Sequence, residues 1–288
     1  MEIRNIQKTG DMHYLYLPTS WCREHGITSK SKVSITNNSD GTLSISPEIT
    51  EKKPKHLKFT ISEDDPEIIH KLVVSSYIHP VSSFEILMDK EVDFTKLINQ
   101  KRLISLESVE IDKKQITSEG MVTVSDPSSL LKTMARKIKN LIIVIGKNYD
   151  KNLIEKYEDE IDRSKMLIDK ALIGSLTMGK TTKLRSIELY YISIISKELE
   201  RVVDGLICFD SKDQKFLDEI TKPIDILQDI LHEPLKIDQE LAMKFARCVS
   251  HIKIPNTKDQ KAMDRIIANL TNISEVVMDW MVTLRIEN

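Results

Sequence analysis

Apolar residues recur every three to four positions from Pro127 to the end of the chain, and this period constrains the fold more than any other feature. A repeat of about 3.6 residues is that of an α-helix with one apolar face. Further helices are predicted at about 149–176 and 182–209. We therefore expect the C-terminal part of the chain to be all-helical. Its first apolar stripe comprises Leu130, Leu131, Met134, Ile138, Leu141, Ile142 and Ile145.

The N-terminal segment has a different pattern, in which short alternating stretches are separated by turn residues. Two hairpins are predicted, and the second contains Asp40–Gly41, a pair that favours a tight β-turn. A short helix between them is expected to begin at an N-cap supplied by Thr19 or Ser20 and to end at Gly26. Four strands and one short helix bury too little surface to be stable alone, so this segment is expected to pair with a second copy or with the rest of the chain.

The stretch between these two parts indicates a small α+β module. Residues 48–56 are charged and contain Pro54, which is typical of a linker. Residues 57–124 predict the order β-α-β-α-β-β, with Pro66 in the first turn of the first helix and a second helix at 93–104. The module has no glycine-rich phosphate loop and no metal-ligand spacing, so the sequence assigns it no chemistry. The chain is thus expected to be a multidomain α+β protein with domains at 1–50, 51–126 and 127–288.

Charge and cysteine content limit the classes of function. Lysine and arginine number 42 against 44 aspartate and glutamate, a formal net charge of −2, so any nucleic-acid contact has to be local. Cys22, Cys208 and Cys248 are far apart and form no CxxC motif, which favours a reducing compartment. The longest apolar run, at 141–145, is far too short to cross a bilayer. We therefore expect a cytoplasmic protein without a transmembrane segment.

Residues 174–181 match the pattern of a phosphate-binding P-loop, G-x-x-x-x-G-K-[ST]. Such a loop needs a strand before its first glycine, so that backbone N–H groups can surround the phosphates. The residues before Gly174 have a helical pattern instead. Nucleotide binding is therefore not expected, and no Ser/His/Asp or Cys/His constellation indicates an enzyme.

Two pairs of carboxylates stand at helical spacing in the second and third predicted helices, Glu158 with Asp162 and Glu200 with Asp204. Each pair lies on the flank of its helix's apolar stripe, at about 100° per residue. The two pairs are equally distant from residue 181, which falls in the turn between the helices. In an antiparallel hairpin all four carboxylates would come level, and their repulsion would be costly unless a cation offset it.

The ligand chemistry of these four acids favours a hard cation. Carboxylate oxygens suit a divalent or trivalent ion, and Mg, Mn, Ca, Fe and Zn are not distinguished by the sequence. The alternative is that the acids are solvated residues on a helix flank, as carboxylates four apart usually are. The sequence leaves both interpretations open.

The stretch IQKTGDMHYLYLPTSWCREHGITSKSKVSI, followed by DGTLSISP, resembles a SpoVT/AbrB domain. The resemblance implies a homodimer with swapped hairpins, which in many members of that family binds DNA. The basic residues at matching positions are Arg4, Lys8 and Arg23. Arg4 and Lys8 are expected on one face of a strand, where cations can follow the phosphates of a duplex.

Two departures weigh against DNA binding by this segment. Thr19 and Ser20 stand where relatives often carry a basic residue. Five basic residues within 1–50 are balanced by five acidic residues. The alternative is therefore a dimerisation module whose charges are merely solvated.

The stretch LRSIELYYISIISKELERVVDGL resembles the PhoU family, whose helices carry an E-x-x-x-D motif, here Glu200 and Asp204. The resemblance covers roughly 127–288 and implies two three-helix repeats that bind metal clusters and regulate phosphate uptake. An archaeal branch of that family joins an AbrB-like domain to the PhoU domain, which is the order found in this chain.

The second repeat departs from the motif. In MDRIIANLTNISE, Asp264 holds the first acidic position but Ala268 replaces the second. Cys248 and His251 are alternative ligands there, although a core cysteine and a surface histidine are the simpler interpretation. The second site is expected to be degenerate. In the first repeat Val203 replaces a small glycine, so helix packing there can differ.

Two functions follow from these resemblances. The first is a DNA-binding transcriptional regulator of phosphate uptake with a metal-binding PhoU-like sensor or docking domain. The alternative is an adaptor that has lost DNA binding and regulates a phosphate transport system through protein contacts. The expected partners are DNA, phosphate transport or sensing machinery, and at least one further copy of the chain.

Overall fold

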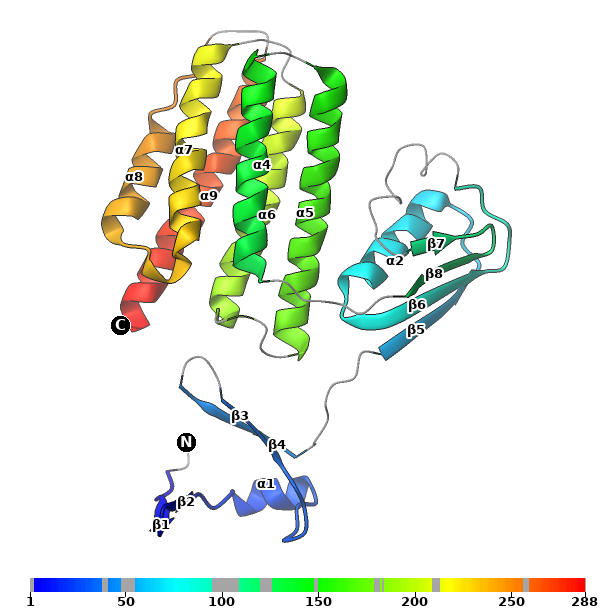
Figure 1. Ribbon diagram of the computed structural model, residues 1–288, viewed down its shortest axis with the longest axis vertical. Helices are drawn as coiled ribbons and strands as arrows, with labels where there is room; N and C mark the ends of the chain where they lie inside the picture. Colours follow the sequence, from blue (N-terminus) through cyan, green and yellow to red (C-terminus); the bar gives the residue numbers. More distant parts are fainter. Residues whose placement is uncertain are drawn as a thin grey trace. The chain divides into compact units, whose positions relative to one another are not determined.

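The structure is a computed structural model that describes residues 3–37, 41–47, 55–94, 109–119, 126–147, 150–178, 182, 184–208, 213–255 and 259–287. The described residues form eight α-helices and eight strands, so the chain is a mixed α+β protein with a helical C-terminal region (Figure 1). The chain divides into two compact units, residues 1–53 and 54–288. Each unit is described by itself.

The N-terminal unit consists of two separate hairpins joined by a short helix. β1 pairs antiparallel with β2, and β3 pairs antiparallel with β4, as the sequence predicts. Gly10 and Gly41, in the turns, have φ angles of 63° and 81°, which residues with a side chain rarely adopt. The elements are β1 (Gln7–Thr9), β2 (Met12–Tyr14), α1 (Thr19–Glu24), β3 (Ser34–Asn37) and β4 (Leu43–Ser46).

Helix α1 ends as predicted but begins differently. Gly26 follows the helix with a φ of 61°, so glycine ends it in the left-handed conformation. Pro18, however, occupies the N-cap position, and no side chain caps the first turn. The prediction that Thr19 or Ser20 is the N-cap is therefore wrong, because both already lie inside the helix.

The second unit contains a four-stranded sheet in the order β5-β6-β8-β7. β5 runs parallel to β6, and the other neighbouring pairs are antiparallel. Helix α2 buries Ile69 and Val73 against the apolar face of this sheet, beside Phe84 and Ile86. The helix predicted at 93–104 falls almost wholly outside the described residues. The elements are β5 (Lys55–Ile61), α2 (Pro66–Ile78), β6 (Val81–Met88), β7 (Val109–Ile111) and β8 (Gln115–Glu119).

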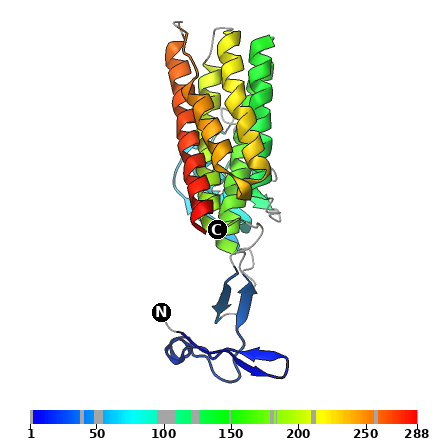
Figure 2. The ribbon, with the colours of Figure 1, turned by 90° about the vertical axis from the view of Figure 1, so that its left-hand side faces the viewer.

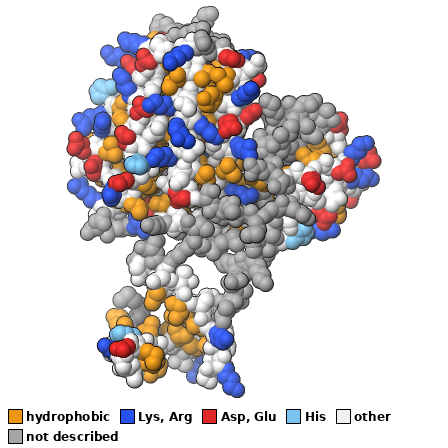
Figure 3. All heavy atoms as spheres, in the orientation of Figure 1, with side chains coloured by type: hydrophobic (Ala, Val, Ile, Leu, Met, Phe, Trp, Pro, Cys, Tyr) orange, Lys and Arg blue, Asp and Glu red, His pale blue; other side chains and the backbone are white. Residues whose placement is uncertain are grey.

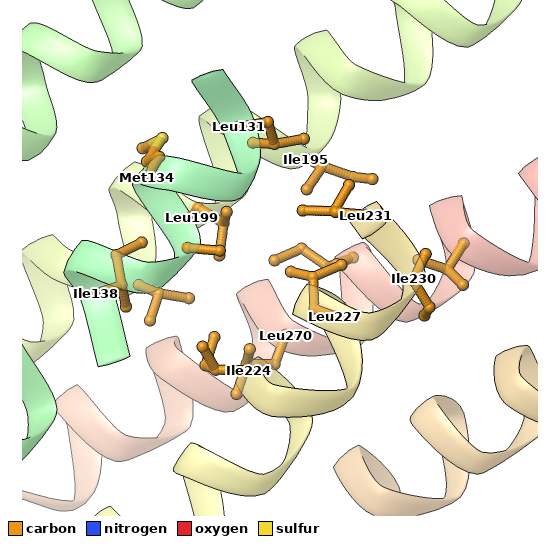
Figure 4. Close-up of a cluster of buried hydrophobic side chains, with 14 of the residues drawn as sticks. Leu131, Met134, Ile138, Ile195, Leu199, Ile224, Leu227, Ile230, Leu231 and Leu270 are labelled. Atoms are coloured by element: carbon orange, nitrogen blue, oxygen red, sulfur yellow. The ribbon is translucent and has the colours of Figure 1, made fainter. Parts of the chain in front are cut away.

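The rest of this unit consists of helices that lie side by side in Figures 1 and 2. Their shared core is mostly aliphatic, with α4, α6, α7 and α9 contributing the side chains labelled in Figure 4, and it also contains Tyr191, Phe216, Phe245 and Trp280. None of the described helices is long and apolar enough to cross a membrane. The helices are α4 (Pro127–Lys147), α5 (Lys151–Met178), α6 (Ser186–Ile207), α7 (Gln214–His232), α8 (Gln239–Ser250) and α9 (Gln260–Glu287), with a 3₁₀ turn at Pro234–Lys236.

Helices α6 and α9 approach each other closely at Gly205. A Cβ atom there would lie 2.6 Å from Cγ1 of Ile266, which is closer than two non-bonded carbon atoms normally approach. Farther along the pair, Asn272 Nδ2 donates a hydrogen bond of 3.0 Å to the buried carboxylate of Glu198. The small residue that permits close packing is therefore Gly205. It lies two positions after the buried Val203, where the sequence suggested that helix packing can differ from that of the PhoU family.

Candidate metal centre

The four acids predicted from the sequence lie on α5 and α6, beside the buried stripe of each helix. Ile161 of α5 and Leu199 of α6 are fully buried, and each is the immediate neighbour of an acid. The buried stripes therefore fix the direction in which the acidic flanks face. Glu158 and Glu200 are half-buried, whereas Asp162 and Asp204 are exposed.

The structure brings these acids close enough to repel one another. Asp162 is exposed as a residue, but the protein around its carboxyl group removes part of that group's hydration. This desolvation, followed by the carboxylates of Glu200, Glu158, Asp204 and Asp159 in that order, raises the pKa of Asp162 from 3.8 to about 7. Both α6 acids therefore lie within electrostatic range of Asp162 on α5. Because Asp162 is still open to water, solvent screens part of this repulsion.

Two cations lie near the acids, and both already have partners. Lys165 forms an ion pair with Asp169 on the same helix, and its charge opposes the rise in the pKa of Glu200 that burial causes. Arg201 also lowers that pKa but is bound to Glu198 at 2.6 Å. The cluster of Glu158, Asp162, Glu200 and Asp204, called here the acidic cluster, therefore keeps an excess of negative charge.

The side chains of the acidic cluster are not arranged as a coordination shell. No three Asp, Glu, His or Cys side chains within the described part of the chain converge closely enough to hold an ion. The donor set nevertheless fits a hard cation, since it consists of carboxylate oxygens only. Rotation about side-chain bonds would be needed to bring the oxygens onto one ion.

Sequence reasoning missed Lys165 and Asp169 as neighbours of the cluster. Their spacing of four residues, with Lys165 three positions after Asp162, was a signal that could have found them, because residues three and four apart share a helix face. It also missed the buried Glu198, which binds Asn272, 74 positions away, and no local pattern shows such a pair.

The stretch predicted to be a second repeat lacks a matching cluster among its described residues. Asp264 and Ala268 are both exposed on α9. Cys248 is half-buried, and burial raises the pKa of its thiol. His251 is exposed, and its Nδ1 lies 2.6 Å from the carbonyl oxygen of Arg247. Cys248 and His251 both line a groove of about 810 Å³ between α7 and α8, together with Lys222, Lys244 and Arg247.

The three residues predicted to contact DNA are all exposed in the N-terminal unit. Lys8 lies in β1 opposite His13, and Arg23 lies in the last turn of α1. Arg4 precedes β1, which begins at Gln7. The expectation that Arg4 and Lys8 share one strand face is therefore wrong, because the strand is shorter than the alternating pattern suggested.

The chain matches no family model, no curated protein and no solved structure. The resemblances to the SpoVT/AbrB and PhoU families therefore stay predictions, and the function has to be argued from the geometry.

Proposed function

We propose that the chain is a DNA-binding transcriptional regulator of phosphate uptake whose helical, PhoU-like domain binds a divalent or trivalent cation at the acidic cluster. The observation that carries this proposal is the mutual approach of Glu158, Asp162, Glu200 and Asp204 across α5 and α6. Four acids within electrostatic range of one another on neighbouring helices destabilise the fold unless their charge is offset. A bound cation offsets the charge, with carboxylate oxygens of the cluster as its ligands.

The ligand chemistry of the cluster indicates a class of ion and does not select one metal within it. Oxygen-only ligands suit Mg²⁺, Ca²⁺ or Mn²⁺, and carboxylate sites also take iron and zinc. Protons compete with the ion, because the raised pKa of Asp162 keeps that ligand partly protonated near neutral pH. Ion affinity should therefore increase as the pH rises through about 7.

The DNA-binding part of the proposal rests on the N-terminal unit. None of its described residues is buried, and hydrophobic side chains are visible on its surface in Figure 3. Ile35 and Leu43 are each 63% exposed. Ile35, Leu43 and Ile45 share one face of the β3–β4 hairpin, whereas the other face carries only serine and threonine. A second copy of the chain would cover this apolar face. Pairing would also double the number of exposed cations available to a duplex, which favours phosphate binding.

Metal content and thermal melting test the cation site. Manganese at about 100 times its dissociation constant should stabilise the wild type by about 2.7 kcal/mol, an increase of several degrees in Tm. The variant Glu200→Gln with Asp204→Asn should not respond. The control is Glu275→Gln with Asp279→Asn, an exposed pair on α9 with the same spacing, which should respond like the wild type. Identical melting of the wild type with manganese and with chelator would reject the site.

DNA binding is tested by fluorescence anisotropy of the full chain with a pool of random duplexes over a range of salt concentrations. Removing Lys8 or Arg23 should weaken binding and reduce the salt slope by about one per residue. Lys30→Ala, an exposed control in the same unit, should have little effect. Binding that is indifferent to both substitutions would refute the assignment of these contacts.

A second function is favoured by the charge of the N-terminal unit. Its basic and acidic residues balance over positions 1–50, so no net field attracts DNA. The alternative is an adaptor that binds a cation and regulates a phosphate transport system by protein contact. A chain that binds manganese but not DNA, at any salt concentration tested, would favour this adaptor.

A further inference from the structure

The α+β module, defined as β5 to β8 with α2, packs on the same helix that carries half of the acidic cluster. Helix α2 contacts α5 directly, and Met166 of α5 packs against the hydrophobic core of the module. One turn farther along α5, the ammonium group of Lys170 lies 3.8 Å from the centre of the Tyr77 ring of α2. A cation over an aromatic face is attracted to the ring, and more strongly when the cation is desolvated.

The module contact continues the line of the acids along α5. Glu158, Asp162, Met166 and Lys170 follow one another at intervals of four residues. Each interval advances about 6 Å along the helix and turns the side chain by about 40°. The module contact therefore begins one turn beyond Asp162, on the adjoining part of the helix surface.

An ion pair lies between the cluster and the module contact. Lys165 and Asp169 are paired on α5, with side chains that are only 17% and 26% exposed. Both charges reach Glu200 on α6, where Lys165 lowers and Asp169 raises the pKa. The electrostatic environment of the cluster therefore extends into the turns of α5 that hold the module.

We propose that the α+β module senses whether the acidic cluster holds a cation, through the position of α5. Without an ion, carboxylates on α5 and α6 repel and favour displacement of α5 from α6. A bound ion draws the two helices together and holds α5 where it seats the module. Ion binding and module docking then strengthen each other, because coupling between two sites is reciprocal. This inference rests on the proposed cation site.

Calorimetric titration of the full chain with Mn²⁺ at neutral pH tests the coupling. Met166→Ala and Lys170→Ala each weaken docking while keeping a good helix former on α5. Each should reduce Mn²⁺ affinity by about fivefold or more, the lower range of known coupling effects. The matched control is Lys156→Ala, which removes the same charge from an exposed position of α5 closer to the acids. Its affinity should stay the same or rise.

Hydrogen exchange in the wild type gives a second measurement that needs no variant of the contact. Mn²⁺ should slow amide exchange in α2, and this effect should disappear in Glu200→Gln. A wild type that binds no Mn²⁺ would overturn the cation site and, with it, the coupling. Normal Mn²⁺ binding by the wild type, together with affinities within twofold in both contact variants or unchanged exchange in α2, would overturn the coupling alone.

Discussion

The two ends of the chain use apolar residues in opposite ways. The helical region gathers its aliphatic side chains into one core, in which residues such as Ile138, Leu199 and Leu270 are fully buried. The N-terminal unit exposes Ile35 and Leu43 and buries none of its described residues. The helical region can therefore be stable by itself, whereas the N-terminal unit needs a partner surface to bury enough area. Folding and assembly are thus expected to be separate events in this chain.

The largest expected effect is on assembly of the N-terminal unit. Ile35→Asp places a charge on the apolar face of the β3–β4 hairpin, and burying an unpaired charge costs several kcal/mol. We expect this substitution to raise the dissociation constant of the proposed dimer by at least about a hundredfold, measured by light scattering over a range of concentrations. Thr36→Asp puts the same charge on the polar face and should leave the dimer intact. Equal behaviour of the two variants would show that the interface lies elsewhere.

The next effect concerns the close packing of the helical region. Gly205→Ala forces its new methyl group against Ile266, 2.6 Å away, and overpacking of this kind costs about 1–3 kcal/mol. The higher helix propensity of alanine offsets roughly 1 kcal/mol of this cost. We expect a lower Tm in melts of the full chain, with no change in the mass of the assembly.

A double variant identifies the cause of this loss. In a chain that already carries Ile266→Ala, Gly205→Ala should reduce the free energy of unfolding by less than it does in the wild type, because the clash is relieved. An additive result would mean that Ile266 is not the residue displaced. A change in assembly mass would contradict the separation of folding from association.

A smaller effect is expected from the acidic cluster and depends on pH. The folded pKa of Asp162 is about 7 against an ordinary 3.8, so the folded state holds its proton more tightly than the unfolded state. Repulsion therefore destabilises the metal-free protein increasingly as the pH rises from about 4 to about 7. Above about pH 7 this loss of stability stays constant. The carboxylates that raise the pKa of Asp162 are those of Glu200, Glu158, Asp204 and Asp159, and the cation Lys165 acts on Glu200.

Asp162→Asn removes this titration. The free energy of unfolding of the variant should exceed that of the wild type by about 1 kcal/mol more at pH 7.5 than at pH 4.5, after allowance for solvent screening. This corresponds to roughly 2–4 °C in Tm. Thermal melts in chelator at both pH values measure the difference. Asp264→Asn, at an exposed position of α9, is the control and should show none. Parallel pH profiles of the wild type and Asp162→Asn would mean that the acids do not repel.

The success of sequence reasoning differed between the two regions for a physical reason. Helix periodicity is local, so the start of α4 at Pro127 and the flank positions of all four acids were predictable. Strand length depends on a pairing partner, and β1 covers only Gln7–Thr9, which leaves Arg4 outside it. The contact of Glu198 with Asn272 and the close approach at Gly205 depend on helix pairs distant in sequence, which no local pattern encodes.

The smallest expected effect is the loss of stability when a helix cap is removed, which differs between the two regions. Asp238 caps α8, since its carboxylate accepts a hydrogen bond of 2.7 Å from the backbone N–H of Leu241. Asp238→Ala should therefore cost about 1 kcal/mol, or a few degrees in Tm. Ser20 lies within α1, whose first turn has no side-chain cap, so Ser20→Ala should change stability by less than about 0.5 kcal/mol. Melting curves of both variants measure the contrast. An equal loss in Ser20→Ala would restore the hydroxyl as a cap and would mean that α1 begins later than Thr19.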